Sequence, residues 1–436
     1  MAKRTYVADV DLNLEGKSVV IAGWAQEVRD LKKIKFILLR DRTGNTQCVA
    51  LENETEKESF DLISQITKES VVEVTGVMNK SEQAKKGFEV VIKKIKLFSK
   101  AEPLPIDISG KIETNLDKRI DFRFLDTRRP EINAIFKVRS EIYAAAVEFF
   151  KKNGFININT PKITVIGVES GAELFEVNYF GKKAFLSQSP QVYKEMMVAA
   201  GFEKVYEIGP VFRAEKSHTT RHLTEFTGID FEIGFIKDEN TVMDAIEDLI
   251  KYILKKVQKN CMPELALLKA NISIPKKIPR VPMSECRKLL AEKGKVLPEN
   301  EDFDPESEKM MGDIAKEKFG SDFIFVTRYP WAKRPFYHMK PDKSPNETKS
   351  FDLLWNGVEV ATGAQREHRY EILKAQAKEK GLDLDKMGDY ANIFKFGMPP
   401  HGGVGFGLDR MTQRVLNLDN VREAILLPRD PDRLRP

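Results

Sequence analysis

Cysteine and histidine are scarce in this sequence, with three and five copies among 436 residues. Cys48, Cys261 and Cys286 lie far apart without a CxxC pair, and the histidines show no ligand spacing, so neither a disulfide framework nor a zinc site is supported. No run approaches the roughly 18 apolar residues that a membrane helix needs. Residues 1–10 also lack the apolar core of a signal peptide. We therefore expect a cytoplasmic protein with no membrane partner.

A large excess of one charge is missing as well. The formal net charge is +5, which is too small to establish a polyanionic partner but is compatible with a local basic patch. The sequence contains no GxxxxGK[ST] phosphate loop. A composition of 42% hydrophobic and 31% charged residues is ordinary for a globular protein, and the length allows two or three domains.

Short β-like runs separated by turn formers fill residues 17–100, with one helical stretch near residues 55–67. Five such strands predict a small Greek-key barrel of the oligonucleotide-binding type. Barrels of this type bind single-stranded nucleic acid on one sheet face, through stacking aromatics and polar side chains. Phe36 beside Lys35, with Gln47 on the following strand and Lys85 in a later loop, would form such a face. A strand aromatic is, however, more often a core residue.

Two prolines and a glycine within residues 101–111 predict an extended linker. We expect a barrel domain over residues 1–102, a linker and hinge module over residues 103–130, and a larger domain over residues 131–436. In the larger domain, apolar residues at helical spacing predict an amphipathic helix from Glu131 to Lys152, followed by a strand that stops at Pro161. Residues 262–345 show no motif and are expected to form a less regular insertion.

The larger domain is organised around residues 205–235, where two alternating apolar and polar segments flank a charged centre. This pattern predicts an antiparallel hairpin with a long loop, whose first strand ends in FRAE and whose return strand starts near His222. Clustered arginines and carboxylates suit a polyphosphate beside a zwitterion, because guanidinium groups form forked bonds to phosphate and carboxylates accept from amines. A solvated, salt-bridged hairpin is the common alternative.

A second hairpin is expected around Asn356 and Gly357. Asp352 and Glu359 are seven residues apart, so they would face opposite sides of one strand and can meet only if the chain turns between them. With that turn, the two carboxylates and the Thr362 hydroxyl offer hard oxygen ligands for a Mg²⁺ ion that bridges phosphates. A plain charged hairpin remains the alternative.

Glycines alternate along the last predicted strand, at Gly403, Gly405 and Gly407, and this strand runs into a helix that carries Arg410. Alternate glycines clear one face, so a flat ring can lie against the backbone, while Arg410 stands at the positive end of the helix. We interpret the segment as a nucleotide site. A dinucleotide-binding fold needs a parallel βαβ unit and an acid about twenty residues on, and is set aside.

These features together resemble the class II aminoacyl-tRNA synthetases. The helix with the Pro161 strand, the FRAE hairpin and the GVGFGLDR segment are similar to motifs 1, 2 and 3 of that class, in that order. Within the class, QSPQVYKE, EFTGID, GVEVATGAQREH and LLPRDPDRLRP, with the loop that carries Glu169, resemble compact archaeal and eukaryotic aspartyl-tRNA synthetases of subclass IIb. The implied fold is α+β: a five-stranded OB-type barrel before a catalytic domain with an antiparallel sheet flanked by helices.

The resemblance implies ATP as a substrate and Mg²⁺ as the cofactor. Arg213 would contact the α-phosphate, Glu215 the adenine amino group and Phe226 the adenine face, while Arg221 and Arg410 would contact the outer phosphates. The full implied ATP site comprises Arg213, Glu215, Arg221, His222, Leu223, Phe226, Glu359, Gly407 and Arg410. The implied catalytic residues are Arg213, Glu359 and Arg410. The implied magnesium ligands are Asp352, Glu359 and Thr362.

The resemblance also implies L-aspartate as the amino acid. Ser189, Gln191 and Asp230 match positions that hold its ammonium group and main chain, and Lys194 with Arg366 would pair its side-chain carboxylate. Glu169 and Thr362 complete the implied aspartate site. Because neutral asparagine would leave Lys194 without a counter-charge, the alternative of an asparaginyl-tRNA synthetase is disfavoured. A non-charging RNA-binding paralogue is a further alternative.

The implied partners are tRNA(Asp) and a second copy of the chain. In the barrel, Phe36, Gln47 and Glu89 match positions that stack on or read anticodon bases, and Gln26 and Lys85 join the implied anticodon site. Members restricted to tRNA(Asp) tend to carry tryptophan at the place of Gln26, and relaxed members histidine, so charging of tRNA(Asn) stays open. Pro161 lies in the segment that resembles the dimer interface of the family.

Overall fold

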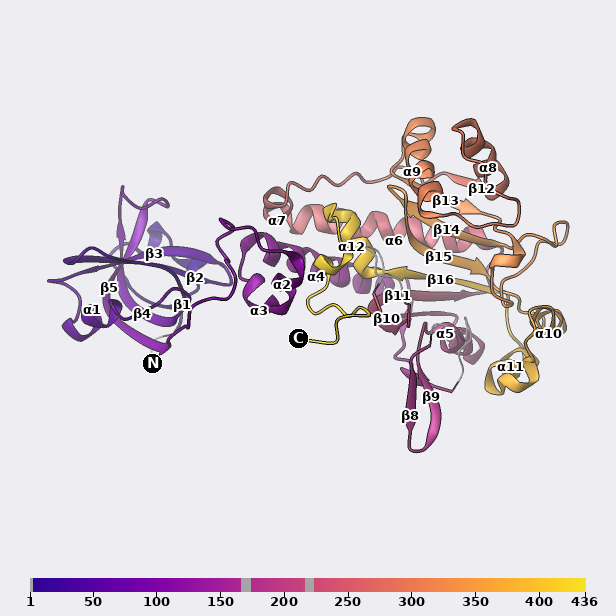
Figure 1. The fold of residues 1–436 in the computed structure, drawn as a ribbon, viewed down its shortest axis with the longest axis horizontal. Helices are drawn as coiled ribbons and strands as arrows, with labels where there is room; N and C mark the ends of the chain where they lie inside the picture. Colours follow the sequence, from indigo (N-terminus) through magenta and orange to yellow (C-terminus); the bar gives the residue numbers. More distant parts are fainter. Residues whose placement is uncertain (1–2, 166–173, 216–222) are drawn as a thin grey trace. The chain divides into compact units, whose positions relative to one another are not determined.

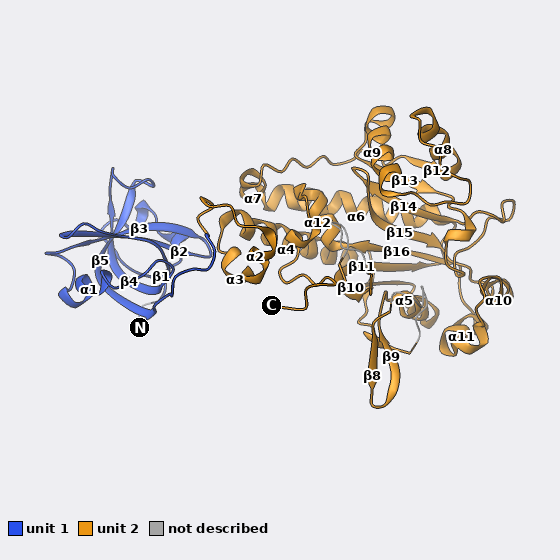
Figure 2. Ribbon diagram, in the orientation of Figure 1, with its two compact units in different colours: residues 1–107 blue, residues 108–436 orange. Residues whose placement is uncertain are grey.

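The computed structural model describes residues 3–165, 174–215 and 223–436. The chain divides into two compact units, Met1–Asp107 and Ile108–Pro436, and the division falls inside the predicted linker (Figure 2). The three cysteines are buried and unbridged. None of the helices in the described part of the chain combines the length and the apolar composition that a bilayer crossing requires.

Unit 1 is a closed five-stranded barrel with the strand order β1-β2-β3-β5-β4, as the sequence predicted (Figure 1). Side chains along β1, β2 and β4 alternate between buried and partly exposed, the period of a strand with one face on a core. The parallel pairing of β3 with β5 closes the barrel around Ile21, Ile37 and Val74. Its elements are η1 (Val7–Asp9), η2 (Leu12–Leu14), β1 (Ser18–Asp30), β2 (Ile34–Asp41), β3 (Gly44–Leu51), α1 (Lys57–Ile63), β4 (Val71–Lys80) and β5 (Phe88–Ser99).

Lys35 does not belong to an exposed face of the barrel, contrary to the sequence prediction. Its side chain is buried, and Nζ donates to the Phe60 carbonyl at 2.8 Å and to Ser64 Oγ at 2.5 Å. The lysine therefore fastens β2 to α1. Strand alternation then turns its neighbour Phe36 to the other, partly exposed side.

Unit 2 is built on an eight-stranded sheet with the order β12-β13-β14-β15-β16-β11-β10-β6. Neighbouring strands from β13 to β10 are antiparallel, as predicted, but both edge strands pair in parallel, which makes the sheet mixed. The strands are β6 (Ile156–Asn157), β10 (Lys204–Phe212), β11 (Glu225–Gly234), β12 (Arg280–Pro282), β13 (Phe323–Thr327), β14 (Ser350–Trp355), β15 (Val358–Gln365) and β16 (His401–Gly407). The predicted α+β fold class is confirmed.

One face of this sheet is covered by α4 (Pro130–Lys152), α6 (Glu239–Asn260) and α12 (Leu408–Leu416) (Figure 1). Ile229, Phe231 and Ile233 of β11 point into that helical layer. Side chains of a strand alternate between faces, so Gly228, Asp230 and Glu232 point to the other side. Asp230 and Glu232 are thus kept away from the main core and gathered on one face.

The remaining elements surround the sheet. A separate three-stranded sheet has the order β7-β9-β8, and its strands come between β6 and α5 in the sequence. The helices α8 and α9 pack against β13 and β14 of the large sheet. These elements are α2 (Leu116–Asp121), α3 (Arg123–Asp126), β7 (Ile163–Thr164), β8 (Glu176–Tyr179), β9 (Lys182–Leu186), α5 (Gln191–Met197), η4 (Val198–Phe202), α7 (Met262–Leu267), α8 (Met283–Glu292), α9 (Pro305–Phe319), η5 (Trp331–Lys333), α10 (Tyr370–Glu379), η6 (Leu384–Met387), α11 (Asp389–Lys395) and η7 (Val421–Ala424).

Two expectations about the larger domain need correction. The strand expected to run up to Pro161 is limited to Ile156–Asn157, with one further backbone hydrogen bond from the Ile158 amide, and the chain reaches the exposed Pro161 outside the ladder. Residues 262–345 are more regular than expected, because β12 and β13 extend the large sheet and α8 and α9 bury Met283, Cys286 and Met311 against it. The short strands gave too few residues for a period to be recognised.

Candidate active site

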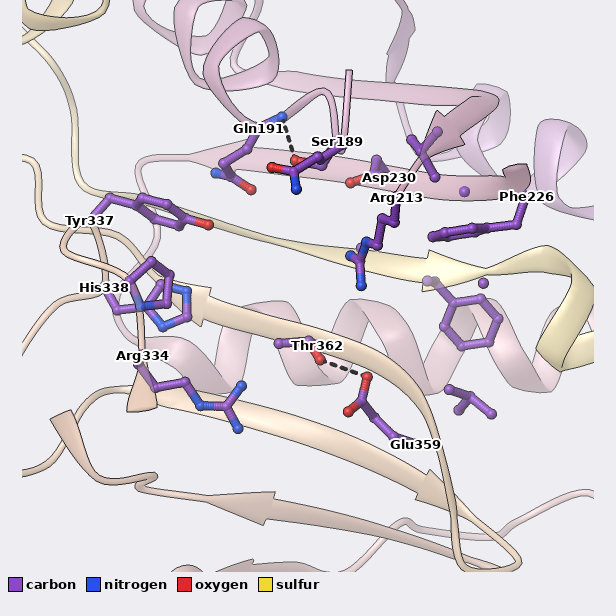
Figure 3. A pocket seen from close by; sticks show the side chains of 18 of the residues that line it. Ser189, Gln191, Arg213, Phe226, Asp230, Arg334, Tyr337, His338, Glu359 and Thr362 are labelled. Atoms are coloured by element: carbon purple, nitrogen blue, oxygen red, sulfur yellow. Dashed lines mark hydrogen bonds between the residues drawn. The ribbon is translucent and has the colours of Figure 1, made fainter. Parts of the chain in front are cut away.

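A cavity of about 660 Å³ lies on the face of the large sheet that carries the polar residues of β11. Figure 3 shows Ser189, Asp230 and Arg213 along one side of it, with His338 and Glu359 across from them. Twelve of the residues predicted from the sequence line this cavity: Ser189, Gln191, Arg213, Glu215, Leu223, Phe226, Asp230, Glu359, Thr362, Arg366, Gly407 and Arg410. Residues from four separate stretches of sequence therefore meet at one place.

The second predicted hairpin forms around Asn356 and Gly357, both at positive φ, in a two-residue turn between β14 and β15. A β-bulge leaves Val360 as an extra residue on β15. Because the bulge shifts the alternation by one, Glu359 and Thr362 both line the cavity although they are three residues apart. Thr362 Oγ1 donates to Glu359 Oε1 at 3.1 Å.

Asp352 is engaged elsewhere and does not line the cavity with these two residues. Arg334 donates two hydrogen bonds of 3.2 and 2.5 Å to its carboxylate. The central carbon of the same guanidinium lies 3.8 Å from the centre of the Tyr329 ring. Burial raises the pKa of Asp352 to about 6, against the opposing effect of Arg334. Asp352 as a magnesium ligand stays a prediction, and the oxygen ligands that face the cavity are those of Glu359 and Thr362.

The alternating glycines of β16 have a different role from the one predicted. A Cβ at Gly403 would lie 2.0 Å from Glu232 Oε2, and one at Gly405 would lie 3.3 Å from Asp230 Oδ1. These two positions therefore make room for carboxylates of the neighbouring strand rather than for a flat ring. Gly405 and Gly407 both line the cavity, and Gly407, beside Arg410, is the one whose space no neighbouring carboxylate shares.

At one end of the cavity, which we call the buried end, Asp230 and Arg366 line the wall and pair with Lys194 and Glu232, which do not line it. Lys194 Nζ lies 3.1 Å from Asp230 Oδ1 and 3.4 Å from Glu232 Oε2, and Arg366 Nε donates to Glu232 Oε1 at 3.1 Å. Burial opposes the charge of Arg366, but the Glu232 carboxylate keeps its pKa above the ordinary value. Lys194 is thus already balanced by carboxylates of the protein, and the prediction that asparagine would leave it without a counter-charge was wrong.

Arg334, Tyr337 and His338 line the same cavity and were missed from the sequence. His338 Nε2 contacts Arg366 Nη1 at 2.9 Å. Burial, and then the charge of Arg366, lower the pKa of His338 well below its ordinary value, so it is a neutral ring that accepts from the arginine. The only local signal was the density of basic and aromatic residues in WAKRPFYH.

The other end, which we call the open end, carries Arg213, Glu215, Phe226, Glu359 and Arg410. Arg213 lies 3.8 Å from Glu215, and its guanidinium lies 5.4 Å from the centre of the Phe226 ring. Arg410 donates to the Glu359 carbonyl at 2.9 Å and lies 3.6 Å from its carboxylate. Two cations and one aromatic face at this end suit a nucleotide triphosphate.

Asp409 holds the start of α12 beneath the open end. Its carboxylate accepts from Arg139 of α4 at 2.7 Å and from the Thr227 amide at 2.8 Å. Burial raises the pKa of Asp409 even though Arg139 lowers it. The predicted residues Glu169, Arg221 and His222 lie outside the described residues.

In unit 1, Gln47 and Glu89 are joined by a 2.7 Å hydrogen bond, and Phe36 and Lys85 lie at least partly exposed on the barrel. Gln26 occupies a β-bulge between Ala25 and Glu27 of β1. Its Oε1 is buried without a hydrogen-bond partner among the described residues. These residues are placed on a barrel of the predicted type, and their contacts with RNA stay a prediction.

Comparisons with known proteins agree with both units. A family model described as tRNA synthetases class II (D, K and N) matches residues 115–431, and one described as OB-fold nucleic acid binding domain matches residues 19–98. The aspartate–tRNA(Asp) ligase of Pyrococcus abyssi is 46% identical, and the aspartate–tRNA(Asp/Asn) ligase of Methanopyrus kandleri is 44% identical; each match covers 100% of both chains.

Similar solved structures also span the whole chain. Asparaginyl-tRNA synthetase from Pyrococcus horikoshii, complexed with asparaginyl-adenylate, has a TM-score of 0.94 at 32% identity and covers 100% of both chains. Aspartyl-tRNA synthetase from Entamoeba histolytica has a TM-score of 0.90 at 31% identity and covers 100% of this chain and 93% of its own. This chain therefore belongs to the class II aminoacyl-tRNA synthetases of the aspartate, lysine and asparagine group.

Proposed function

We propose that the protein is an aspartate–tRNA ligase of the cytoplasm. It activates L-aspartate with ATP and transfers the aspartyl group to the 3′ end of tRNA(Asp). The observation that carries this proposal is Arg366, a buried cation on the cavity wall. Three of its five N–H donors are used by Glu232, His338 and Gln191, and the other two have no partner among the described residues.

The reaction has two steps. An oxygen of the aspartate α-carboxylate attacks the α-phosphorus of ATP, the bond to the β-phosphate oxygen breaks, and pyrophosphate leaves. A ribose hydroxyl of the tRNA end then attacks the activated carbonyl, and AMP leaves. No protein nucleophile is needed. Arg213 stabilises the charge on the α-phosphate, and Arg410 holds the outer phosphates, so the protein acts by positioning and electrostatics.

Glu359 and Thr362 fit a magnesium ion. Their carboxylate and hydroxyl oxygens lie 3.1 Å apart on the cavity wall, and Mg²⁺ usually takes one or two carboxylates and completes its shell with water and substrate phosphate. When bound, the ion neutralises phosphate charge. In the described part of the chain, no cluster of three or more histidine, cysteine or carboxylate side chains offers a different metal site.

An asparagine–tRNA ligase is the second candidate, because the similarity to the asparaginyl-tRNA synthetase of Pyrococcus horikoshii extends over the whole chain. Asparagine has no charge for Arg366 to pair. Because Glu232 already balances the charge of Arg366, the difference lies in its two remaining N–H donors. A carboxylate accepts from both, whereas a side-chain amide offers one oxygen and leaves a buried donor unsatisfied, which costs about 1–3 kcal/mol and corresponds to roughly 10- to 100-fold discrimination. The proposal therefore favours aspartate.

The test is charging of tRNA(Asp) and tRNA(Asn) transcripts by the purified chain, with Mg·ATP and labelled aspartate or asparagine supplied separately. We expect aspartate on tRNA(Asp). Aspartate on both tRNAs would make Gln26 a relaxed discriminator, and aspartate on tRNA(Asp) alone would make it a restrictive one. Asparagine on either tRNA would overturn the proposal.

We propose that the barrel binds the anticodon through Phe36, Gln47 and Glu89. Phe36→Ala should raise the KM for tRNA roughly 10-fold, because loss of one stacked base costs about 1–3 kcal/mol. Aspartate-dependent exchange of pyrophosphate into ATP should not change, since that reaction needs no tRNA. An equal effect on both reactions would contradict this role.

We further propose a homodimer that includes the exposed segment around Pro161. Sedimentation equilibrium of the full chain should give twice the monomer mass of 49.8 kDa. A monomer mass over the whole concentration range would refute it.

A further inference from the structure

Behind the buried end lies a second group of polar side chains that does not line the cavity. Glu195 of α5, Tyr390 of α11 and His401 of β16 are all fully buried. The reaction as described above uses none of them. Burying a carboxylate, a phenol and an imidazole costs free energy unless each group has a hydrogen-bond partner. Their partners therefore indicate what the group does.

Glu195 is the centre of this group. Its Oε2 lies 3.0 Å from His401 Nε2 and 3.3 Å from the Tyr390 hydroxyl, and its Oε1 accepts from Gln191 Nε2 at 2.6 Å. Burial alone would raise the pKa of Glu195, but the hydrogen bond and charge of His401 hold it below the ordinary value. The carboxylate is therefore ionised and offers only acceptor atoms.

His401 is complementary to this carboxylate on both sides of its ring. Nε2 faces Glu195, and Nδ1 lies 2.9 Å from the carbonyl oxygen of Pro399. Both of these partners present acceptor oxygens, so each ring nitrogen faces an acceptor. The backbone carbonyl of His401 also accepts from the Arg366 amide at 2.9 Å. One histidine thus ties Glu195 and Arg366 to the same point of β16.

The ionised Glu195 decides how the amide of Gln191 is turned. Because Oε1 of Glu195 can only accept, the NH₂ group of Gln191 must face it, and Gln191 Oε1 must face Arg366 Nη2, which donates at 3.1 Å. The reverse orientation would place NH₂ against the guanidinium, donor against donor. Glu195 thereby controls the polarity of a cavity wall that it does not reach.

We propose that Glu195, held by His401 and Tyr390, is a positioning residue for amino-acid binding. It fixes the Gln191 amide, and through it the Arg366 guanidinium, in the orientation that receives the substrate carboxylate. This inference rests on the proposed function, since it assigns a role at the aspartate end of the same cavity. It predicts an effect on aspartate and none on ATP.

The test measures aspartate-dependent pyrophosphate exchange and the separate KM values for aspartate and ATP. Glu195→Ala removes the acceptor, so the Gln191 amide is free to turn; we expect the KM for aspartate to rise about 10- to 100-fold while the KM for ATP stays within about twofold. Tyr390→Phe removes only the longer hydrogen bond and should raise the KM for aspartate no more than about threefold.

Glu195→Gln is the conservative rescue. Its amide oxygen accepts from Gln191, and its NH₂ group donates to Nε2 of the His401 ring in the tautomer whose Nδ1 donates to the Pro399 carbonyl. The KM for aspartate should return to within about threefold of the wild type. The matched control is Glu247→Ala, which also removes a buried carboxylate, one that pairs with Lys251 and accepts from the Ile278 amide. This control should change neither KM.

A variant that exchanges the two groups, Gln191→Glu with Glu195→Gln, keeps the hydrogen bond between positions 191 and 195 and the net charge. It places a carboxylate against Arg366, so the KM for aspartate should rise at least about 10-fold in a folded protein. Wild-type KM values in Glu195→Ala or in the exchange variant would overturn the inference, as would equal rises for aspartate and ATP. A wild-type chain without aspartate-dependent exchange would overturn the proposed function itself.

Discussion

The two ends of the cavity use the same kinds of residue but differ in how deeply they are buried. At the buried end, the side chains of Lys194, Glu232 and Arg366 are 2%, 0% and 3% exposed. At the open end, those of Arg213, Glu359 and Arg410 are 38%, 36% and 26% exposed. Charged side chains of the same kinds therefore lie in a desolvated environment at one end of the cavity and in a solvated environment at the other.

This difference in burial suits the buried end to recognition of the amino acid and the open end to binding of ATP and release of pyrophosphate. Buried charges lose their water, so each is held by fixed partners, and a ligand with the wrong charge pays the full electrostatic penalty. Exposed charges are screened and cost little to rearrange. The buried end therefore suits aspartate, which the enzyme must distinguish from asparagine. The open end suits the polyphosphate of ATP, which must bind and then leave as pyrophosphate.

Replacement of Lys194 gives the sharpest test of this comparison. Lys194→Met leaves Asp230 and Glu232 without their shared cation, so the free energy of unfolding should fall by about 3–5 kcal/mol. The buried end then carries an excess negative charge that repels the substrate carboxylate, so aspartate-dependent exchange should fall at least about 10-fold. Urea unfolding and exchange assays measure both. Lys251→Met, which breaks a partly exposed pair with Glu247, is the control and should cost no more than about 1 kcal/mol.

Arg213→Ala should lower the rate of the reaction strongly and the stability of the fold very little. We expect kcat for pyrophosphate exchange to fall about 10²- to 10³-fold, because the α-phosphate loses a preorganised cation. The free energy of unfolding should change by less than about 0.5 kcal/mol, since the side chain is partly exposed. Arg213→Lys should recover only part of the rate, because lysine lacks the forked donors. A large loss of stability would break the distinction between the two ends.

Glu359→Gln tests the metal side of the open end. Loss of the carboxylate should raise the Mg²⁺ concentration that gives half-maximal exchange by at least about 10-fold, with little change in the KM for aspartate. A magnesium titration at saturating ATP measures the shift. Glu379→Gln, in an exposed pair with Lys340, serves as the control. An unchanged magnesium requirement would remove Glu359 from the proposed ligands.

His338→Gln should have the smallest effect, seen in the pH dependence of stability. The pKa of His338 is lowered from 6.5 in the folded chain, chiefly by burial. Below about pH 6.5 the unfolded chain therefore binds a proton that the folded chain does not, and the free energy of unfolding falls as the pH falls. Glutamine keeps an acceptor for Arg366 and removes this proton.

Urea unfolding of the wild type and His338→Gln at about pH 7 and about pH 5.5 isolates the contribution. The wild type should lose about 1 kcal/mol more than the variant between these values, from at most about 1.4 kcal/mol per pH unit for one proton. Equal losses would mean that His338 is charged in the folded chain.

Most of the fold could be predicted because its signals are local. The alternation in residues 17–100, the helical spacing from Glu131 to Lys152 and the turn at Asn356 and Gly357 are properties of short segments. The predicted cavity residues rested on the resemblance of several motifs to the class II aminoacyl-tRNA synthetases, and 12 of them line one cavity. The edge strands β6 and β12, with two and three residues, are too short for any period, and only pairing with their neighbours defines them.

The sequence by itself determined most of the segments that form strands and helices, and, away from the β-bulges, which polar residues face the same side of each. The tertiary structure decided which charges pair. Gln191 and Arg366 are 175 residues apart and Glu195 and His401 are 206 apart, while Asp352 is held by Arg334 from a segment without any motif. Periodicity repeats within a few residues, whereas the partner of a buried charge is fixed by packing between distant segments.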